Sequence, residues 1–342
     1  MSALENQRGA KIVDVAKRSG VSISTVSRVL NQNPKVGAKE REAVLRAASE
    51  LNYVPNGSAR ALRSTRSRLV GAIIPTLNHA IYATMADGLE TRLAENGVSL
   101  IINTSAYDIE TEFKQARLLV ERGVESIILV GSMHKPETLR MLEEKRVGYV
   151  YTYTNDPSEK GAAIGFDNEK AGGTAAQFLS DLGHTRFAMI AGITQDNDRA
   201  KGRIDGYLNK LRMLGHDPKN VQIVEAAYDV ESGRQAMESL LTAEVRPTAV
   251  FCGSDILAAG AVKQCQNNGI NVPKDVSVMG FDNLEIAELT TPDLTTLEVP
   301  ARAMGVHAAD YALESLVQRK SMRQRELPIR LIVRGSTSSA PK

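Results

Sequence analysis

The sequence has very little cysteine and no long apolar run. Cys252 and Cys265 are the only cysteines among 342 residues, too few for a disulfide framework or a four-ligand zinc site. No apolar run approaches the ~20 residues that a membrane span requires, and the first residues lack the apolar stretch of a signal peptide. We therefore expect a cytoplasmic protein with no disulfide and no membrane partner.

The sequence also lacks the motifs of common enzyme classes. It contains no GxSxG elbow, HExxH pair, phosphate-binding loop or GxGxxG fingerprint. Its five histidines show no metal-ligand spacing: His79, His134, His184, His216 and His307. These absences predict a protein that is not an enzyme and that has no catalytic residue, metal or cofactor.

Positive charge is concentrated at one end of the chain. Residues 1–68 hold 13 Lys and Arg against 5 Asp and Glu, a net charge of +8. The remaining residues hold 29 against 35, a net charge of −6. A small basic segment on a larger acidic body is typical of a protein in which one end binds a polyanion. A solvated basic tail is the alternative, unless the segment has the pattern of a folded module.

The basic segment has the apolar pattern of three short helices. Apolar residues recur at helical spacing: Ile12, Val15 and Ala16, then Val26, Val29 and Leu30, then Val44, Leu45, Ala48 and Leu51. Gly20 is suited to end the first helix, and Ser22 is suited to cap the second. The third helix is expected at about 38–52. Two short helices around a glycine turn, backed by a third, predict a helix-turn-helix.

The second of these helices would expose Ile23, Ser24, Thr25, Ser27 and Arg28. In a helix-turn-helix, the N-terminal part of this helix enters the major groove of double-stranded DNA. Arg28 could bind a guanine edge through two hydrogen bonds, while Ile23 and Ser24 could contact a thymine methyl group and a base edge or phosphate. The hydroxyl groups suit phosphate oxygens.

From residue 69 onward, apolar strands alternate with amphipathic helices. The expected strands are 69–74, 98–102, 126–130, 149–151, 163–166, 187–191, 221–224, 249–252 and 276–280. This order predicts parallel sheets with helices on both faces. Two sets of strands predict two lobes, with a ligand bound in the crevice at the carboxyl ends of the strands.

A repeated tetrapeptide marks two of these strand ends. Gly-Phe-Asp-Asn occurs at 165–168 and again at 280–283. Asp167 and Asp282 are candidate hydrogen-bond acceptors for a ligand, and each following Asn is a candidate helix cap. Two other interpretations stay open: both aspartates could only stabilise turns, or they could be the carboxylate pair of a glycoside hydrolase.

Four segments of the chain resemble the LacI/GalR family of bacterial transcriptional regulators. They are Asp-Val-Ala at 14–16, Gly-Val-Ser at 20–22, Thr-Val-Ser-Arg-Val-Leu-Asn at 25–31 and Leu-Asn-Tyr-Val-Pro-Asn at 51–56. The resemblance implies a DNA-binding repressor in which the positions of Ile23 and Ser24 select the operator and that of Arg28 reads a base. It also implies a small all-α helix-turn-helix domain joined by a hinge helix to an α/β, two-lobed, periplasmic-binding-protein-like domain of type I.

The hinge is expected in residues 56–64, which are fewer than the ~12 needed for a stable isolated helix. Such a segment can become ordered only when it binds a partner. The resemblance implies that two hinge helices enter the minor groove, through Ser58, Ala59, Arg60, Leu62 and Arg63. Leu62 would insert into a base step and kink the DNA, with Arg60 and Arg63 near phosphates. A plain linker is the alternative, and Gly57 disfavours helix formation.

The resemblance also implies a small-molecule effector, such as a sugar, a sugar acid or a similar polar metabolite. The residues that it assigns to the effector site are His79, Ile81, Tyr82, Ser132, Asp167, Asn197, Arg199, Arg203, Tyr228 and Asp282. We expect Arg203 to be a buried cation opposite Asp282, because a buried charge needs that partner or a ligand. Arg199 could instead be a surface charge.

The expected domains are 10–55 for the helix-turn-helix, 56–66 for the hinge and 67–337 for effector binding and dimerisation. The N-lobe should comprise about 69–166 plus 301–325, and the C-lobe about 167–300 plus 326–337. The polar tail has no leucine heptads for a tetramer, so we expect a homodimer that acts at the bacterial nucleoid. A solute-binding protein for a transporter is the alternative for the body alone. The sequence does not predict the effector, its sign of action or the operator.

Overall fold

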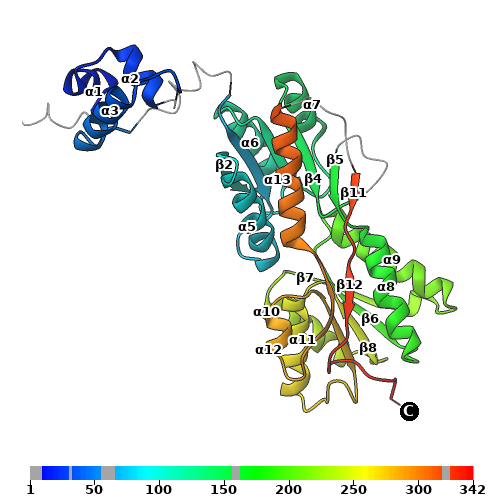
Figure 1. The fold of residues 1–342 in the computed structure, drawn as a ribbon. Helices are drawn as coiled ribbons and strands as arrows, with labels where there is room; N and C mark the ends of the chain where they lie inside the picture. The colour runs from blue at the N-terminus through cyan, green and yellow to red at the C-terminus, as the bar shows by residue number, and fades with distance from the viewer. Residues whose placement is uncertain (1–9, 31–32, 55–65, 156–161, 318–323, 342) are drawn as a thin grey trace, which may run out of the picture. The chain divides into compact units, whose positions relative to one another are not determined.

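The computed structural model describes residues 10–30, 33–54, 66–155, 162–317 and 324–341 (Figure 1). The chain divides into two compact units, residues 1–67 and residues 68–342. In the part of the chain that is described, no helix is long and apolar enough to span a bilayer.

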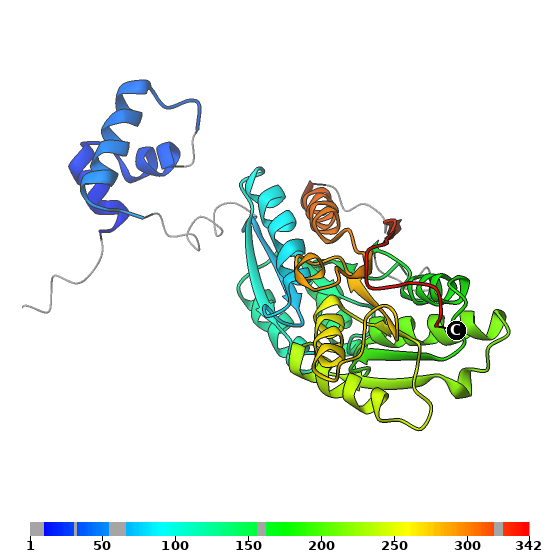
Figure 2. The same ribbon diagram turned by 90° about the horizontal axis from the view of Figure 1, so that it is seen from below.

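Three short helices form the first unit (Figure 2): α1 (Ile12–Ser19), α2 (Ile23–Leu30) and α3 (Ala38–Glu50). α1 ends at Gly20, whose φ of +71° lies in the left-handed region that glycine adopts without steric cost. α2 follows Ser22, whose Oγ accepts a hydrogen bond of 3.1 Å from the N–H of Thr25. The predicted helix-turn-helix is therefore confirmed.

The core of this unit is built from small and β-branched side chains. Its buried residues are Val15, Ala16, Val26, Val29, Val44, Ala47 and Ala48. The prediction that Leu45 is buried was wrong, because its side chain is 51% exposed. Leu45 lies about 100° around the helix axis from Val44, so Ala47, one turn after Val44, takes the place in the core.

The second unit contains two lobes, each with a six-stranded sheet. The N-lobe sheet has the order β11-β5-β4-β3-β1-β2, and each neighbouring pair is parallel. Its strands are β1 (Leu69–Ile74), β2 (Ser99–Thr104), β3 (Ser126–Val130), β4 (Gly148–Thr152), β5 (Ala162–Gly165) and β11 (Gln324–Glu326). The helices of this lobe are α5 (Ala80–Ala94), α6 (Ile109–Glu121), α7 (Pro136–Lys145) and α13 (Ala301–Val317).

The C-lobe sheet has the order β12-β10-β9-β8-β6-β7, with only the β10–β12 pair antiparallel. Its strands are β6 (Phe187–Gly192), β7 (Gln222–Ala226), β8 (Ala249–Cys252), β9 (Ser277–Asp282), β10 (Thr295–Glu298) and β12 (Arg330–Ile332). Its helical segments are α8 (Asn168–Asp181), α9 (Asp198–Met213), η2 (Pro218–Asn220), α10 (Val230–Leu241), α11 (Asp255–Asn267) and α12 (Ile286–Leu289).

Both faces of each sheet are covered by helices. Along β1, Val70 and Ala72 belong to the core beneath α5 and α13, whereas Ile73 belongs to the core beneath α6 and α7. The C-lobe repeats this arrangement, with α8 and α9 on one face and α10 and α11 on the other. Strands buried on both faces are apolar throughout, which explains why the sequence predicted them as continuous runs.

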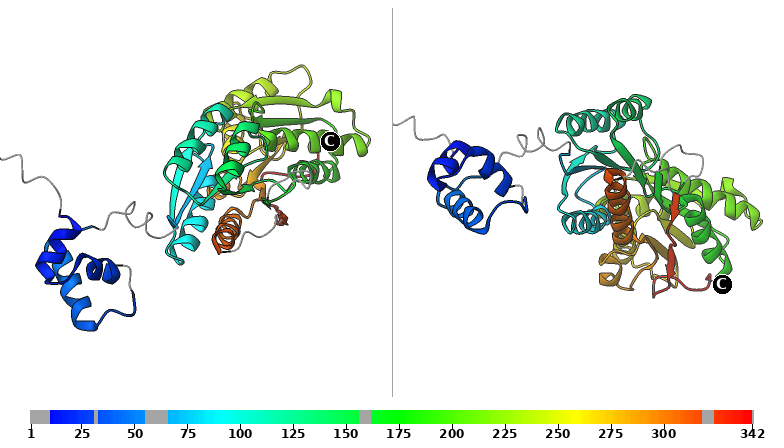
Figure 3. Two further views of the ribbon diagram at one scale, coloured as in Figure 1. Left: turned by 90° about the horizontal axis from the view of Figure 1, so that it is seen from above. Right: turned by 45° about the horizontal axis from the view of Figure 1, so that its top comes forward.

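The chain passes between the lobes three times, from β5 to α8, from β10 to α13 and from β11 to β12 (Figures 1 and 3). The nine predicted strands agree with observed strands to within two residues at each end. β10, β11 and β12, which have three or four residues each, were not predicted. β11 is also exposed throughout, so it carries no apolar signal.

Candidate functional site

The outer face of α2 carries mostly polar side chains. Of the five residues predicted to enter the major groove, three are exposed, namely Ile23, Ser24 and Arg28. The other two, Thr25 and Ser27, are half-buried. The hydroxyl of Ser22 lies 2.7 Å from that of Ser24 and 2.9 Å from that of Thr25. A group of hydroxyls therefore surrounds the N-terminus of α2, where the helix dipole favours an anion.

The predicted hinge residues lie outside the described part of the chain. They are Ser58, Ala59, Arg60, Leu62 and Arg63. Their proposed roles therefore rest on the sequence alone.

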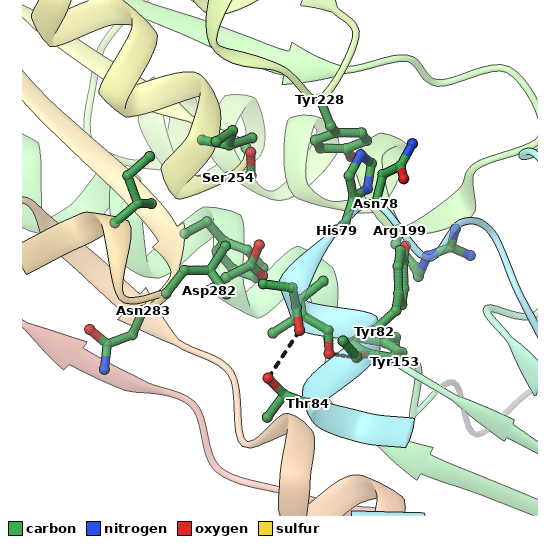
Figure 4. Close-up of a pocket in the computed structure, with 18 of the residues that line it drawn as sticks. Asn78, His79, Tyr82, Thr84, Tyr153, Arg199, Tyr228, Ser254, Asp282 and Asn283 are labelled. Carbon is green, nitrogen blue, oxygen red and sulfur yellow. Dashed lines mark hydrogen bonds between the residues drawn. The ribbon is translucent and has the colours of Figure 1, made fainter. Parts of the chain in front are cut away.

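A cavity of about 670 Å³ lies between the two lobes of the second unit (Figure 4). Loops at the carboxyl ends of strands from both sheets form its wall, as expected for parallel sheets. Eight of the ten residues predicted to bind an effector line this cavity: His79, Ile81, Tyr82, Asn197, Arg199, Arg203, Tyr228 and Asp282. Ser132 and Asp167 do not line it.

Aromatic rings form one side of the cavity. Tyr107 and Tyr228 stack with ring centroids 5.9 Å apart, and His79 meets Tyr228 edge-on at 5.2 Å. Tyr82 meets Tyr153 edge-on at 5.4 Å (Figure 4). Burial lowers the pKa of His79, so its imidazole is neutral at pH 7. Tyr107 and Tyr153 were not predicted, although each follows a strand at its carboxyl end, which is the signal that could have identified them.

The guanidinium of Arg203 is buried in the cavity wall, with 7% of the residue exposed. Its Nη1 donates to Oδ1 of Asn168 at 2.7 Å, and its Nη2 donates to the hydroxyl of Tyr228 at 3.3 Å. The guanidinium carbon lies 4.6 Å from the centre of the Phe281 ring. Nε is buried without a hydrogen-bond partner among the described residues. Among the described residues Arg203 forms no ion pair with Asp282, which was one of the two partners, Asp282 or a ligand, that the sequence left open.

Two residues at the start of α9 connect the lobes. Oδ2 of Asp198 accepts hydrogen bonds from the N–H and the hydroxyl of Ser132, at 2.8 and 2.9 Å. Nη1 of Arg199 donates to Oδ1 of Asp198 at 2.8 Å and to the carbonyl of Val130 at 3.1 Å. Because Val130 ends β3 and Asp198 begins α9, these bonds form an interlobe contact. Ser132 thus holds the lobes together instead of lining the cavity, and Arg199 is not a surface charge.

The interlobe contact keeps its carboxylate ionised. Burial raises the pKa of Asp198, but the charge of Arg199 and the two donors of Ser132 outweigh burial, so the pKa is lowered. His134 fixes the loop that carries Ser132 through hydrogen bonds at both of its ring nitrogens. The ring nitrogens of His134 lie 2.7 Å from Oε1 of Glu112 and 3.0 Å from the carbonyl of Gly131.

Asp282 lines the opposite side of the cavity on a strained backbone. Its φ is +108°, a value that residues other than glycine rarely adopt. Behind it, Asp255 accepts hydrogen bonds of 2.6 Å from the hydroxyl of Thr296 and 2.7 Å from the N–H of Leu284. Burial raises the pKa of Asp255 to about 6. Burial and the nearby Asp255 raise the pKa of Asp282 well above its usual value.

The first copy of the repeated motif has a structural role. Phe166 and Phe281, one from each copy, pack with ring centroids 5.9 Å apart. Oδ1 of Asp167 accepts a hydrogen bond of 3.0 Å from the N–H of Lys170 and so caps α8. The prediction that Asp167 contacts a ligand is corrected, because its carboxylate serves the helix and lies outside the cavity wall.

The asparagines of the repeated motif form hydrogen bonds with other groups of the protein. Asn168 donates to the carbonyl of Tyr153 at 2.9 Å, and Asn283 accepts from Arg334 at 2.9 Å. Neither caps a helix, so that expectation was wrong for both copies of the motif. Asn197 does cap α9, by accepting from the N–H of Ala200 at 3.4 Å. Within the described ranges, no group of three or more His, Cys, Asp or Glu side chains is placed to hold a metal ion.

Comparisons with known proteins match nearly all of the chain to one group of regulators. Residues 11–56 match the bacterial regulatory proteins of the lacI family, and residues 176–337 match a periplasmic binding protein-like domain. The transcriptional regulator DegA of Bacillus subtilis is 33% identical, over 96% of this chain and 98% of its own. The transcriptional repressor PurR of Klebsiella pneumoniae is 32% identical, over 97% and 98%. The structure of the Lac repressor dimer bound to operator and the anti-inducer ONPF has a TM-score of 0.87, at 27% identity over 97% of this chain and 100% of that one.

Proposed function

Since this chain belongs to the lacI family of bacterial regulatory proteins, we propose that it represses transcription from operators whose affinity depends on a small polar molecule in its cavity. Membership of the family makes the protein a DNA-binding transcriptional regulator. The relatives named above are regulators and not enzymes, and we assign no catalytic residue, metal or cofactor to this chain. Its place of action in this proposal is the nucleoid in the bacterial cytoplasm.

The exposed face of α2 supports the DNA-binding part of the proposal. Arg28 pairs with a guanine edge, and Ile23 and Ser24 select the neighbouring bases. Thr25 and Ser27 bind phosphate oxygens near the helix N-terminus. The hinge residue Leu62 inserts into a base step of the minor groove and kinks the operator.

The proposal that an effector controls the protein rests on the cavity of about 670 Å³ between the lobes. The chain crosses between these lobes three times. A molecule bound there touches both lobes, so it can favour one relative position of the lobes over another. A ligand shifts such an equilibrium only as far as its affinity differs between the two states, and typical couplings are about 1–3 kcal/mol. A sugar, a sugar acid or a similar polar metabolite suits the polar groups of the wall.

We also propose that the protein acts as a homodimer on an operator with two half-sites. The Lac repressor structure, a dimer on its operator, supports this assembly. Symmetric half-sites follow from the two-fold symmetry of such a dimer. The domain and lobe limits expected from the sequence are part of the same proposal.

Binding of the full-length protein to promoter fragments of its own genome tests the proposal. Fluorescence anisotropy should detect specific binding at low ionic strength, and the affinity should fall steeply as salt is added, because phosphate contacts release counterions. A metabolite that binds the cavity should change this affinity. If the protein binds none of the fragments, either with or without metabolites, the proposed function is contradicted.

A further inference from the structure

A single peptide group connects His134 to the contact between the lobes. The carbonyl of Gly131 lies 3.0 Å from Nε2 of His134. The N–H of Ser132 belongs to the same peptide group and donates to Oδ2 of Asp198 at 2.8 Å. A peptide group is planar, and in its trans form the C=O and the N–H point in opposite directions. A rotation of this group would disturb both hydrogen bonds at once, so His134 orients the donor that reaches the C-lobe.

The imidazole of His134 faces two acceptors and therefore needs two hydrogens. Its side chain is fully buried, and Nδ1 lies 2.7 Å from Oε1 of Glu112, whose side chain is 8% exposed. A carbonyl oxygen and an ionised carboxylate only accept hydrogen bonds, whereas a neutral imidazole carries a single N–H. Both bonds form together only when the pair of His134 and Glu112 holds one proton more than a neutral imidazole and a carboxylate hold.

Loss of that proton to water leaves one ring N–H for two acceptors. The carboxylate of Glu112 forms the stronger, charge-assisted bond, so the N–H of His134 stays with it. The carbonyl of Gly131 then faces a nitrogen lone pair instead of a donor, which is unfavourable for a buried acceptor. Rotation of the peptide group relieves this, and the same rotation withdraws the N–H of Ser132 from Asp198.

No cation near Glu112 takes the place of the proton among the described residues. The other charged and titratable groups around the pair are Asp108 and Glu110 at the start of α6, Lys135 and Glu137 at the start of α7, Tyr151 of β4, and Asp196, Asp198 and Arg199 at the start of α9. Both cations are already paired, Lys135 with Glu110 and Arg199 with Asp198. The ring of Tyr151 stacks on that of His134 with centroids 5.0 Å apart and adds no charge.

The same proton also acts on the C-lobe partner through its charge. Burial raises the pKa of Asp198, but Arg199 and the two donors of Ser132 lower it, and the positive charge of His134 lowers it further. A protonated His134 therefore favours the ionised form of Asp198, which is the form that accepts from Ser132. Geometry and charge act in the same direction.

We propose that His134 and Glu112 form a proton-dependent latch between the lobes. While the pair holds its extra proton, it positions the N–H of Ser132 for Asp198 and keeps the lobes together. When the proton is lost, the lobes separate more easily. Histidine ordinarily changes its charge between about pH 5 and 8, so the latch responds within the physiological range. This inference rests on the proposed function and adds a regulation of the same movement of the lobes.

Distances between spin labels on the two lobes test the latch without DNA or ligand. In the full-length protein, labels are attached at Lys114→Cys on α6 and Lys219→Cys in η2, which are exposed, whereas both native cysteines are buried. An excess of unlabelled protein keeps labelled chains apart from one another. Longer distances should appear as the pH rises from about 5.5 to about 8, because loss of the proton weakens the contact. Distances that stay the same would overturn the proposal.

Glu112→Gln separates the effect of the proton from a loss of packing. The amide N–H of Gln can donate to Nδ1 of a neutral His134, which leaves the Nε2–H for the carbonyl of Gly131. This variant should therefore keep the short distances at both pH values. His216→Gln is the control and should behave as wild type, since His216 bonds to the hydroxyl of Ser180 at 3.0 Å and a hydroxyl either donates or accepts.

A Glu112→Gln protein whose distances change with pH as those of wild type do would overturn the latch. If this variant does not fold, the pH response of the wild-type distances decides alone.

Operator binding separates the latch from the proposed function. Asp255 also titrates in this range, with a pKa of about 6, so each variant is compared with wild type at the same pH. The ratio of operator affinities at the two pH values should differ at least about 5-fold between wild type and Glu112→Gln. Equal ratios, together with distances that respond to pH, would support the latch and contradict the proposed coupling of the lobes to DNA.

Discussion

The backbone of Gly131 lies so close to the guanidinium of Arg199 that a Cβ atom at position 131 would overlap Nη1. The φ of Gly131 is +84°, which side chains other than that of glycine rarely tolerate. Two independent constraints therefore require glycine at the loop that reaches across to the C-lobe.

Replacing this glycine should disrupt the interlobe contact. Gly131→Ala should lower the free energy of unfolding by about 2–4 kcal/mol, from the strained φ and the overlap together. Gly123→Ala is the matched control, because Gly123 has a φ of +79° and no atom within 4 Å of its added Cβ. It should cost only about 1–2 kcal/mol. Urea unfolding measures both, and equal losses would contradict the overlap.

The bond between Ser132 and Asp198 should have a measurable coupling energy. A double-mutant cycle of Ser132→Ala and Asp198→Asn should give about 1–3 kcal/mol, since the bond is charge-assisted and partly buried. Thr194 and Glu225 provide a control, because their 2.7 Å hydroxyl–carboxylate bond is exposed and lies within one lobe. Their coupling should stay below about 1 kcal/mol. A cycle near zero for the first pair would show that it does not hold the lobes.

Asp255 should make stability depend on pH. Its pKa is about 6 in the folded protein, against about 3.9 for an ordinary aspartate, so the folded state binds the proton more tightly than the unfolded state. The stabilisation from this group is present below about pH 4 and is lost as the pH rises to about 6, with a change of about 3 kcal/mol. The unfolding free energy of Asp255→Asn, measured against wild type from pH 4 to 7, should lack this change. Parallel pH curves would contradict the raised pKa.

Arg28 should contribute to sequence recognition. Arg28→Ala should weaken operator binding by about 1–3 kcal/mol while nonspecific binding changes little. Arg46→Ala, which removes an exposed arginine of the same unit on α3, is the control and should weaken operator and nonspecific DNA alike. Anisotropy titrations with both DNAs measure this. An unchanged preference for operator in Arg28→Ala would remove Arg28 from the base contacts.

Leu62 should bend the operator. Leu62→Ala should reduce the bend angle, because an alanine is too small to separate two base pairs. Energy transfer between dyes at the ends of an operator fragment measures the bend. A bend that stays the same would mean that the hinge only tethers the two units.

The sequence predicted those parts of the fold that depend on local patterns. Apolar runs identified the strands that are buried on both faces. The helical spacing of apolar residues around Val15, Val26 and Val44, one in each helix, identified the core of the first unit. Leu45 was wrongly predicted to be buried, because Val44 and Leu45 are adjacent apolar residues and the sequence does not show which of them faces the core. The packing of α3 decides this. β11 has no apolar pattern and forms by pairing with β5 across a long stretch of chain.

At the cavity, the sequence predicted many of the residues that line the wall, but it did not predict which groups those residues bind. His79, Tyr228 and Asp282 were named and line the wall. The ion pair of Arg199 with Asp198 was not predicted, because adjacent residues on a helix usually point apart. Asp167 and Asp282 were treated alike because their tetrapeptides are identical, yet Asp167 is followed at once by α8, whereas α12 begins only at Ile286. Only the three-dimensional structure distinguishes these two contexts.

The three crossings of the chain affect the order in which the protein can form during synthesis. The first unit has its own core within 67 residues, so it can fold soon after it leaves the ribosome. The N-lobe still needs α13 and β11, which end at Val317 and Glu326, and the C-lobe needs β12, which ends at Ile332. Neither half of the sensor is therefore complete until β11 and β12 have been synthesised, and a stop codon before them would disable both at once.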